Sequence, residues 1–213
     1  MSKSEAYYKM IKKFSILLLC SLLFSCSNRN KAEIFYVKAV EAYSKKDFTA
    51  ALNFSDLTIK NDSDFYQAKL LKAKILYFEN SLEKSFLILK KLIKKYPEYT
   101  DARIWFIRVL LAQSKYDEAE KYLIKELSFN SGDCRVFYQY GNLCSKLNRM
   151  DERLSMYRKA EELLCENSKI YLELADVWLA LGLKDRALDE LDKAELLSDD
   201  KQTIKELKNY IKK

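Results

Sequence analysis

Cysteine is the residue type with the most obvious chemistry in this chain of 213 residues, which contains no histidine. Without histidine there can be no histidine metal site and no Ser-His or Cys-His catalytic pair. No CxxC or other metal-ligand spacing joins the cysteines. The glycines are isolated, which excludes a glycine-rich phosphate loop. We therefore expect no metal and no cofactor. The five cysteines are Cys20, Cys26, Cys134, Cys144 and Cys165, and the three glycines are Gly132, Gly141 and Gly182.

Carboxylates offer no catalytic pair either. Glu118, Glu152 and Asp185 fall at the starts of predicted helices. A negative side chain suits the partial positive charge of a helix N-terminus, so a structural role explains these residues. We expect that the protein is not an enzyme.

Cys26 follows a segment typical of an export signal. Residues 9–13 contain three lysines, and residues 14–24 form an uncharged apolar run. Eleven residues are too few to span a bilayer as a helix, but they suit the apolar region of a secretory signal. The run ends in Leu23-Phe24-Ser25-Cys26, which resembles the lipobox of bacterial lipoproteins, although Phe24 is bulkier than the usual occupant.

The lipobox resemblance implies cleavage after Ser25 and diacylation of the Cys26 thiol, with residues 1–25 as the signal peptide. It implies a lipid-anchored protein of the bacterial cell envelope, for which we favour the periplasmic side of the outer membrane; inner or outer membrane remains open. Three alternatives compete: cleavage without lipidation, an uncleaved anchor, and an ordinary buried Cys26. Because the acidic Glu5 precedes the basic patch of residues 9–13, translation could also start at Met10 instead of Met1.

Composition indicates a helical protein. The chain is 49% hydrophobic and 32% charged, with only three glycines and one proline. Tight turns between strands favour glycine and proline, so this composition argues against a β-sandwich or barrel. The net charge is +7, and loss of four lysines and one glutamate with residues 1–25 leaves +4. We interpret this modest excess as a solvated surface, spread along the helices, and expect no nucleic-acid partner.

A 34-residue repeat organises residues 32–201. Two sets of residues recur at this spacing with no insertion or deletion, and helical three- and four-residue apolar spacing fills the units between them. The units are 32–65, 66–99, 100–133, 134–167 and 168–201. The first set is Ala39, Ala73, Ile107, Gly141 and Ala175, and the second is Ala51, Ser85, Ala119, Arg153 and Ala187.

These units resemble tetratricopeptide repeats (TPRs). The resemblance rests on Ser-Lys-Tyr-Asp-Glu-Ala-Glu-Lys-Tyr-Leu at 114–123, on Tyr140-Gly141 and on the terminal Pro97. It implies an all-α, right-handed α-solenoid of five helix pairs. Residues 202–213, with an apolar stripe of Ile204, Leu207 and Ile211, are predicted to form a capping helix. Residues 26–31 are predicted to be a short tether.

Two positions within the repeat differ from the usual residue types. The turns inside the units fall on Lys46, Asn80, Ser114, Asn148 and Gly182, so only one has glycine. Arg153 occupies a position that otherwise holds a small residue. It should loosen its unit or extend outward, with its charge in water.

The three remaining cysteines belong to the fourth unit. Cys144 falls on the packed face of its helix. Cys134 and Cys165 come at the same end of two antiparallel helices, so a disulfide is conceivable in an oxidising compartment. We favour two free buried thiols over that disulfide, while the pairing stays open.

The TPR resemblance also implies that the first helix of each unit lines a concave surface with exposed inner positions. Apolar and aromatic residues dominate these positions in the first three units. Asn142 fits one place of the carboxylate clamp found in some TPR proteins, but Glu173 and Asp176 oppose a clamp. The predicted partner-binding groove consists of Tyr36, Val40, Tyr43, Leu70, Lys74, Tyr77, Phe78, Ile104, Trp105, Arg108, Tyr138 and Asn142.

The predicted function is that of a membrane-anchored adaptor or scaffold that binds a protein or peptide on this groove. By analogy with exported TPR lipoproteins, it would serve in outer-membrane, pilus or secretion assembly. One alternative is a ligand-binding TPR subunit of a transporter for hydrophobic small molecules, and another is a purely structural surface lipoprotein. Neither the identity of the partner nor the oligomeric state follows from the residues.

Overall fold

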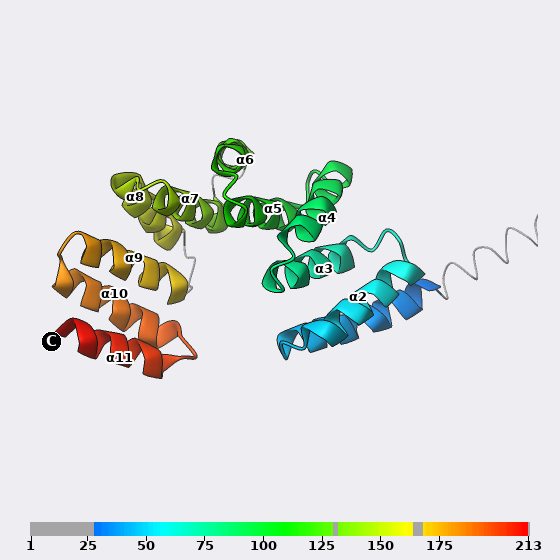
Figure 1. The fold of residues 1–213 in the computed structure, drawn as a ribbon, viewed down its shortest axis with the longest axis horizontal. Helices are drawn as coiled ribbons and strands as arrows, with labels where there is room; N and C mark the ends of the chain where they lie inside the picture. The colour runs from blue at the N-terminus through cyan, green and yellow to red at the C-terminus, as the bar shows by residue number, and fades with distance from the viewer. Residues whose placement is uncertain (1–27, 130–131, 164–167, 213) are drawn as a thin grey trace, which may run out of the picture. The chain divides into compact units, whose positions relative to one another are not determined.

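The computed structural model describes residues 28–129, 132–163 and 168–212, and these residues form helices joined by short turns (Figure 1). No strand occurs in these ranges. The fold class is therefore all-α, as expected. Across the same ranges, no helix is both long enough and apolar enough to cross a membrane.

The chain divides into two compact units between Ala102 and Arg103, a division that falls within one helix. The first unit contains a helix over residues 28–44, followed by α2 (Phe48–Asn61), α3 (Tyr66–Phe78), α4 (Leu82–Lys95) and the start of α5 (Thr100–Ala112). The second contains the rest of α5, then α6 (Tyr116–Phe129), α7 (Cys134–Lys146), α8 (Met150–Glu162), α9 (Ser168–Ala180), α10 (Lys184–Leu197) and α11 (Lys201–Lys212).

Helix starts repeat with the period of the sequence. The first helices of successive repeats, α3, α5, α7 and α9, begin 34 residues apart, and each begins at the first residue of a predicted repeat. The second helices, α2, α4, α6, α8 and α10, also begin 34 residues apart. Each start is thus set by its position in the repeat.

The turn inside each helix pair has the same backbone geometry. Its central residue is left-handed, with φ between 55° and 76°. The next residue donates its N–H to a carbonyl five residues back, for example Asp47 to Ala42 at 3.0 Å and Arg149 to Cys144 at 3.0 Å. This is the Schellman pattern that ends many helices. The five left-handed residues are Lys46, Asn80, Ser114, Asn148 and Gly182.

Small residues allow close helix packing in the first unit. Ala39 and Ala51 are fully buried and form one cluster with Leu71 and Ile75, which joins residues 28–44, α2 and α3. Packed alanines let helix axes approach more closely than large side chains would. In this unit α3 contacts both α2 and α4.

The C-terminal cap is present as predicted. Ile204 and Ile211 of α11 are buried in a cluster with Trp178 of α9 and Leu191 of α10. Lysines lie on the other faces of α11, including Lys201 and Lys205, both exposed. The terminal helix therefore covers an apolar face that would otherwise meet water.

The structure tests only part of what was expected of residues 1–31. The signal peptide, Cys26 and the first residues of the tether lie outside the described residues. Residues 28–31, assigned to the tether, are instead helical. No glycine or proline interrupts this segment, and Arg29 forms an i,i+4 ion pair with Glu33 at 3.8 Å, which supports the helical turn.

Arg153 corrects a second expectation. Its side chain is buried (8% exposed) and neither extends outward nor leaves a gap. It donates to Glu173 at 3.1 Å and to Asp176 at 2.9 Å, both on α9. Because those carboxylates neutralise its charge, a large cation is accommodated where the other repeats have a small residue.

The cysteines give a third correction. Cys134 is disulfide-bonded, although two free thiols were favoured. Its partner lies outside the described residues, as does Cys165. Cys144 is free and buried, as expected.

Candidate interaction surfaces

Four aromatic side chains cluster at one end of the helices of the first unit. Phe48 and Phe78 stack with ring centroids 5.7 Å apart and an interplanar angle of 5°. Tyr43 lies 6.3 Å from Phe78, and Tyr77 meets Phe78 edge-on at 5.5 Å. We call Tyr43, Phe48, Tyr77 and Phe78 the aromatic patch. It brings together three predicted groove residues and one, Phe48, that was not predicted.

The position of each ring in its helix explains why the patch forms. Tyr43 is in the last turn of the first helix, Phe48 begins α2, and Phe78 ends α3. The left-handed residue Lys46 reverses the chain between Tyr43 and Phe48. Phe78 remains 50% exposed, and Val40 of the first helix is 42% exposed. The patch is therefore a partly exposed apolar surface on a packed support.

Tyr36 belongs to a different group of rings. Its ring lies 4.9 Å from Phe65, and burial together with Tyr66 raises the pKa of its hydroxyl. Tyr66 in turn contacts Tyr96 and Tyr99. Tyr36 therefore helps to pack the junction between repeats and does not join the aromatic patch.

Two predicted groove residues are not exposed. Leu70 is 3% exposed and Ile104 is 5% exposed, which corrects the expectation that they line an open surface. The reason is that α3 and α5 are apolar around most of their circumference, and such helices are buried on several sides. Lys74, between the two in sequence, is half-buried.

In the second unit, Trp105 and Arg108 lie together on α5. The Arg108 guanidinium lies 4.5 Å from the centre of the Trp105 ring, a cation–π contact. Both side chains are partly exposed. An aromatic ring beside arginine is a frequent anchor in protein interfaces.

Tyr138 and Asn142 support the core of the second unit. The hydroxyl of the fully buried Tyr157 donates to Asn142 at 2.8 Å, and the ring of Tyr138 lies 5.8 Å from that of Tyr157. The side-chain amide of Asn142 in turn donates to Gln139 at 3.3 Å. Both Tyr138 and Asn142 thus position Tyr157.

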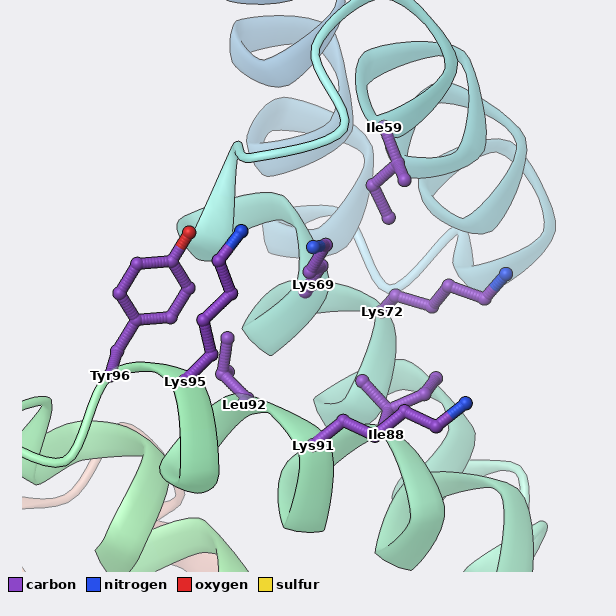
Figure 2. Close-up of a pocket in the computed structure, with 8 residues that line it drawn as sticks. All are labelled: Ile59, Lys69, Lys72, Ile88, Lys91, Leu92, Lys95 and Tyr96. Atoms are coloured by element: carbon purple, nitrogen blue, oxygen red, sulfur yellow. The ribbon is translucent and has the colours of Figure 1, made fainter.

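A pocket in the first unit was not predicted. Its volume is about 280 Å³, and residues of α2, α3 and α4 line it (Figure 2). We call it the lysine pocket. Its lining consists of the apolar side chains Ile59, Ile88 and Leu92, the aromatic Tyr96 and four lysines, Lys69, Lys72, Lys91 and Lys95.

Two of these lysines are held by aspartates. Lys72 pairs with Asp56 at 2.5 Å, and Lys95 pairs with Asp64. The hydrogen bond from Lys95 lowers the pKa of Asp64. Asp56, Asp64 and Lys95 are each more than half exposed, and Lys72 is 28% exposed. Both pairs are therefore surface ion pairs of modest strength. Sequence reasoning missed the pocket because its lining extends from residue 59 to residue 96; the lysine-rich end of α4 was the available signal.

A second hollow, of about 370 Å³, lies beside α11 in the second unit. Its lining includes Leu172, Leu179 and Leu207, together with Asp176 and Asp200. Across the described ranges, no group of cysteine, aspartate and glutamate residues is arranged to hold a metal ion.

Solved TPR structures share this fold. TTC0263, a thermophilic TPR protein of Thermus thermophilus, superposes with a TM-score of 0.76 at 17% identity over 84% of this chain and 98% of its own. MamA of Desulfovibrio magneticus RS-1 gives 0.60 at 17% identity over 80% and 97%. YrrB, a TPR protein with an unusual peptide-binding site, gives 0.52 at 19% identity over 82% and 90%.

No family model and no curated protein matches the sequence. The structural likeness is therefore the basis for assigning the TPR solenoid fold, the class of architecture that the 34-residue period predicts. At sequence identities of 17–19%, this structural likeness shows the fold alone.

Proposed function

We propose that the protein is an adaptor that binds a protein or peptide partner through the first-helix surface of its repeats and is held at a bacterial envelope membrane by a lipid on Cys26. The observation that carries the partner-binding half is the aromatic patch, in which Phe78 is 50% exposed although it stacks on Phe48. Large apolar side chains exposed together on a rigid support are typical of binding surfaces.

Energetics favour a protein partner at this patch. Aromatic side chains supply large contact areas with few rotatable bonds, so little conformational entropy is lost when they are covered. The rings of the patch are already fixed by one another and by the helices that carry them. Likeness to YrrB, whose structure has a peptide-binding site, is consistent with this use of the fold.

Two features support the envelope. The lipobox-like Leu23-Phe24-Ser25-Cys26 motif is typical of exported lipoproteins. Independently, Cys134 is disulfide-bonded, and disulfides persist mainly in oxidising compartments such as the periplasm. A role in outer-membrane, pilus or secretion assembly rests on analogy with exported TPR lipoproteins.

Photo-crosslinking tests the partner surface. A photoreactive phenylalanine analogue replaces Phe78 in one variant and Leu87 in a control variant; Leu87 lies on α4 and is 49% exposed, so the two sites match in exposure. We expect a discrete crosslinked protein from position 78 and none of that mass from position 87. Identical crosslinks from both positions would contradict the assignment of the patch.

Metabolic labelling tests the anchor. Cells that express the full chain are given radiolabelled palmitate, and the product is compared with Cys26→Ala and with Cys20→Ala. The label should be lost only in Cys26→Ala. Labelling that persists in that variant excludes Cys26 as the lipidated residue.

The alternative, a ligand-binding subunit for hydrophobic small molecules, has one feature in its favour. The 370 Å³ hollow beside α11 is lined by several leucines and has the size of a small-ligand site. Native mass spectrometry of the purified full chain distinguishes the two: a stoichiometric small molecule that dissociates on Leu172→Trp supports this alternative.

A further inference from the structure

The lysine pocket lies on a different side of α3 from the predicted groove. Lys72 lines the pocket, and Lys74 belongs to the groove. Two residues apart on an α-helix means a separation of about 200° around its axis. The pocket shares none of its eight lining residues with the twelve predicted groove residues, so it is a separate site within the first unit.

Charge is concentrated around this pocket. α4 contains five lysines and one glutamate. Residues 28–102 hold fourteen lysines and arginines against ten acidic residues, whereas residues 103–213 hold twenty of each. The excess of positive charge, expected to be spread along the chain, therefore belongs to the first unit. At the pocket, ion pairs with Asp56 and Asp64 hold two of the four lysines, so the lysines outnumber the paired aspartates by two.

The floor of the pocket is apolar. Ile59 comes from α2, and Ile88 and Leu92 come from α4. Figure 2 shows Ile88 and Leu92 beside Lys91 and Lys95, and Ile59 apart from them on α2, with Lys95 and Tyr96 toward one end. A cavity of about 150 Å³ with apolar walls binds one benzene molecule. A hollow of about 280 Å³ therefore has room for one or two large apolar side chains.

We propose that the lysine pocket binds an acidic segment of a partner protein, with a leucine or phenylalanine side chain in the hollow and carboxylates on either side at the lysines. Lys91 and Lys95 are one helical turn apart, so carboxylates spaced about 5–6 Å apart along the segment can meet them. This inference rests on the proposed function as a partner-binding protein and adds the chemistry of the partner.

Other occupants fit less well. Residues 1–27 of the same chain carry four lysines and one glutamate, so their charge is repelled by the pocket. A phospholipid headgroup supplies one phosphate to four lysines and leaves its acyl chains uncovered. An acidic segment supplies several carboxylates and a single apolar group of the right size, and its carboxylates can displace the weak surface pairs to Asp56 and Asp64.

Fluorescence anisotropy with a labelled peptide tests the proposal. The probe is a nine-residue peptide with phenylalanine at its centre and glutamate elsewhere, added to the purified full chain. The double substitution Lys91→Glu and Lys95→Glu should weaken binding at least tenfold. The matched control, Lys84→Glu and Lys94→Glu, changes the same charge on the same helix outside the pocket and should weaken binding less than threefold. Circular dichroism checks that both variants fold.

Three further measurements determine the outcome. Replacing the central phenylalanine by glutamate should weaken binding at least fivefold, because the hollow is then empty. Ile88→Trp, which places a larger side chain in the hollow from a partly exposed position, should also weaken peptide binding at least fivefold. The proposal is overturned if both double variants weaken binding equally, if the all-glutamate peptide binds as well, or if phosphatidylglycerol vesicles bind in a Lys91- and Lys95-dependent manner while the peptide does not.

Failure of this test leaves the adaptor proposal intact. The crosslinking experiment uses Phe78, which is not part of the pocket. A crosslink at Phe78 without peptide binding at Lys91 and Lys95 rejects the pocket alone, and the reverse result rejects the aromatic patch alone.

Discussion

Tyr157 is held by both packing and hydrogen bonds in the second unit. It is fully buried, and its hydroxyl donates to Asn142 at 2.8 Å and lies 3.3 Å from a Glu173 oxygen. Burial raises the pKa of this hydroxyl well above its usual value. Gly141 makes room for the ring, since a Cβ at this position would lie 2.3 Å from a ring carbon of Tyr157.

Gly141→Ala should therefore lower the free energy of unfolding by about 1–3 kcal/mol, the usual cost of overpacking a core. Urea denaturation measures it. Gly132→Ala is the control, because a Cβ there meets nothing within 4 Å, and it should change stability by less than about 0.5 kcal/mol. Equal losses in the two variants would show that the contact with Tyr157 is not the cause.

Cys144 should be chemically inert in the folded protein. Burial raises the pKa of its thiol to about 11, and only the thiolate is a good nucleophile. At about pH 8, half a unit below the ordinary thiol pKa, the peptide that contains Cys144 should remain unmodified by maleimide under native conditions and become modified in urea. Peptide mass spectrometry measures both. Rapid native modification would mean that the helix pair opens at this residue.

At the scale of single elements, Asp133 caps the N-terminus of α7. Its carboxylate accepts from the Arg135 N–H at 2.9 Å and from the Arg135 guanidinium at 2.7 Å. These hydrogen bonds lower the pKa of Asp133 below its ordinary value of 3.8. The folded state therefore binds this proton less readily than the unfolded state, so the stabilisation exists above the ordinary pKa and is lost as the pH falls through the lowered one.

Asp133→Ala should cost about 1 kcal/mol at neutral pH, the typical value of an N-cap. The difference from the unmodified chain should shrink as the pH falls below the ordinary carboxyl pKa. Chemical denaturation at a series of pH values measures it. Asp133→Asn, which keeps the cap without the charge, should lose less stability at neutral pH, and its difference from the unmodified chain should shrink over the same pH range, because neither variant carries the titrating carboxyl. A constant difference at every pH would refute the ionic contribution.

The terminal helix α11 is held by its two buried isoleucines. Ile204→Ala should cost about 2–4 kcal/mol, because it leaves a cavity against Trp178 and Leu191. Leu207 lies on the same helix but is 38% exposed, so Leu207→Ala should cost less than half as much. Thermal unfolding followed by circular dichroism compares them, and equal costs would place the core of the cap elsewhere.

At the scale of the whole chain, the repeat period was the strongest predictor. Small residues that recur 34 positions apart, such as Ala39 and Ala73, defined the register of the repeats. In the structure, the first helices of successive repeats begin 34 residues apart, and so do the second helices. Local spacing determines helix faces, so the fold class and the turn positions were predictable. Lys46, Asn80, Ser114 and Asn148 adopt the left-handed turn without glycine.

Long-range pairing was not predictable to the same extent. Arg153 is neutralised by carboxylates 20 and 23 residues later, and the lysine pocket combines three helices. Both depend on which side chains face each other after the helices pack. The exposure of Leu70 and Ile104 was misjudged for the same reason. Their positions in the TPR pattern predict which side of the helix they occupy, but their burial depends on the helices packed against that side.

The disulfide of Cys134 leads to a prediction about the whole chain. Cys20, Cys26 and Cys165 are its possible partners in this sequence, and mass spectrometry of unreduced peptides identifies which one is joined. We expect Cys165. Reduction should then lower the stability by about 2–4 kcal/mol. A bond to Cys26 would instead remove the thiol that the proposed lipid requires.

The left-handed turns have a practical consequence for engineering. This backbone conformation costs a residue with a side chain roughly 1–2 kcal/mol, whereas glycine adopts it freely. Ser114 and Asn148 belong neither to the aromatic patch nor to the lysine pocket. Glycine at these two left-handed turn positions is therefore a route to a more thermostable protein in which both proposed binding surfaces keep their residues.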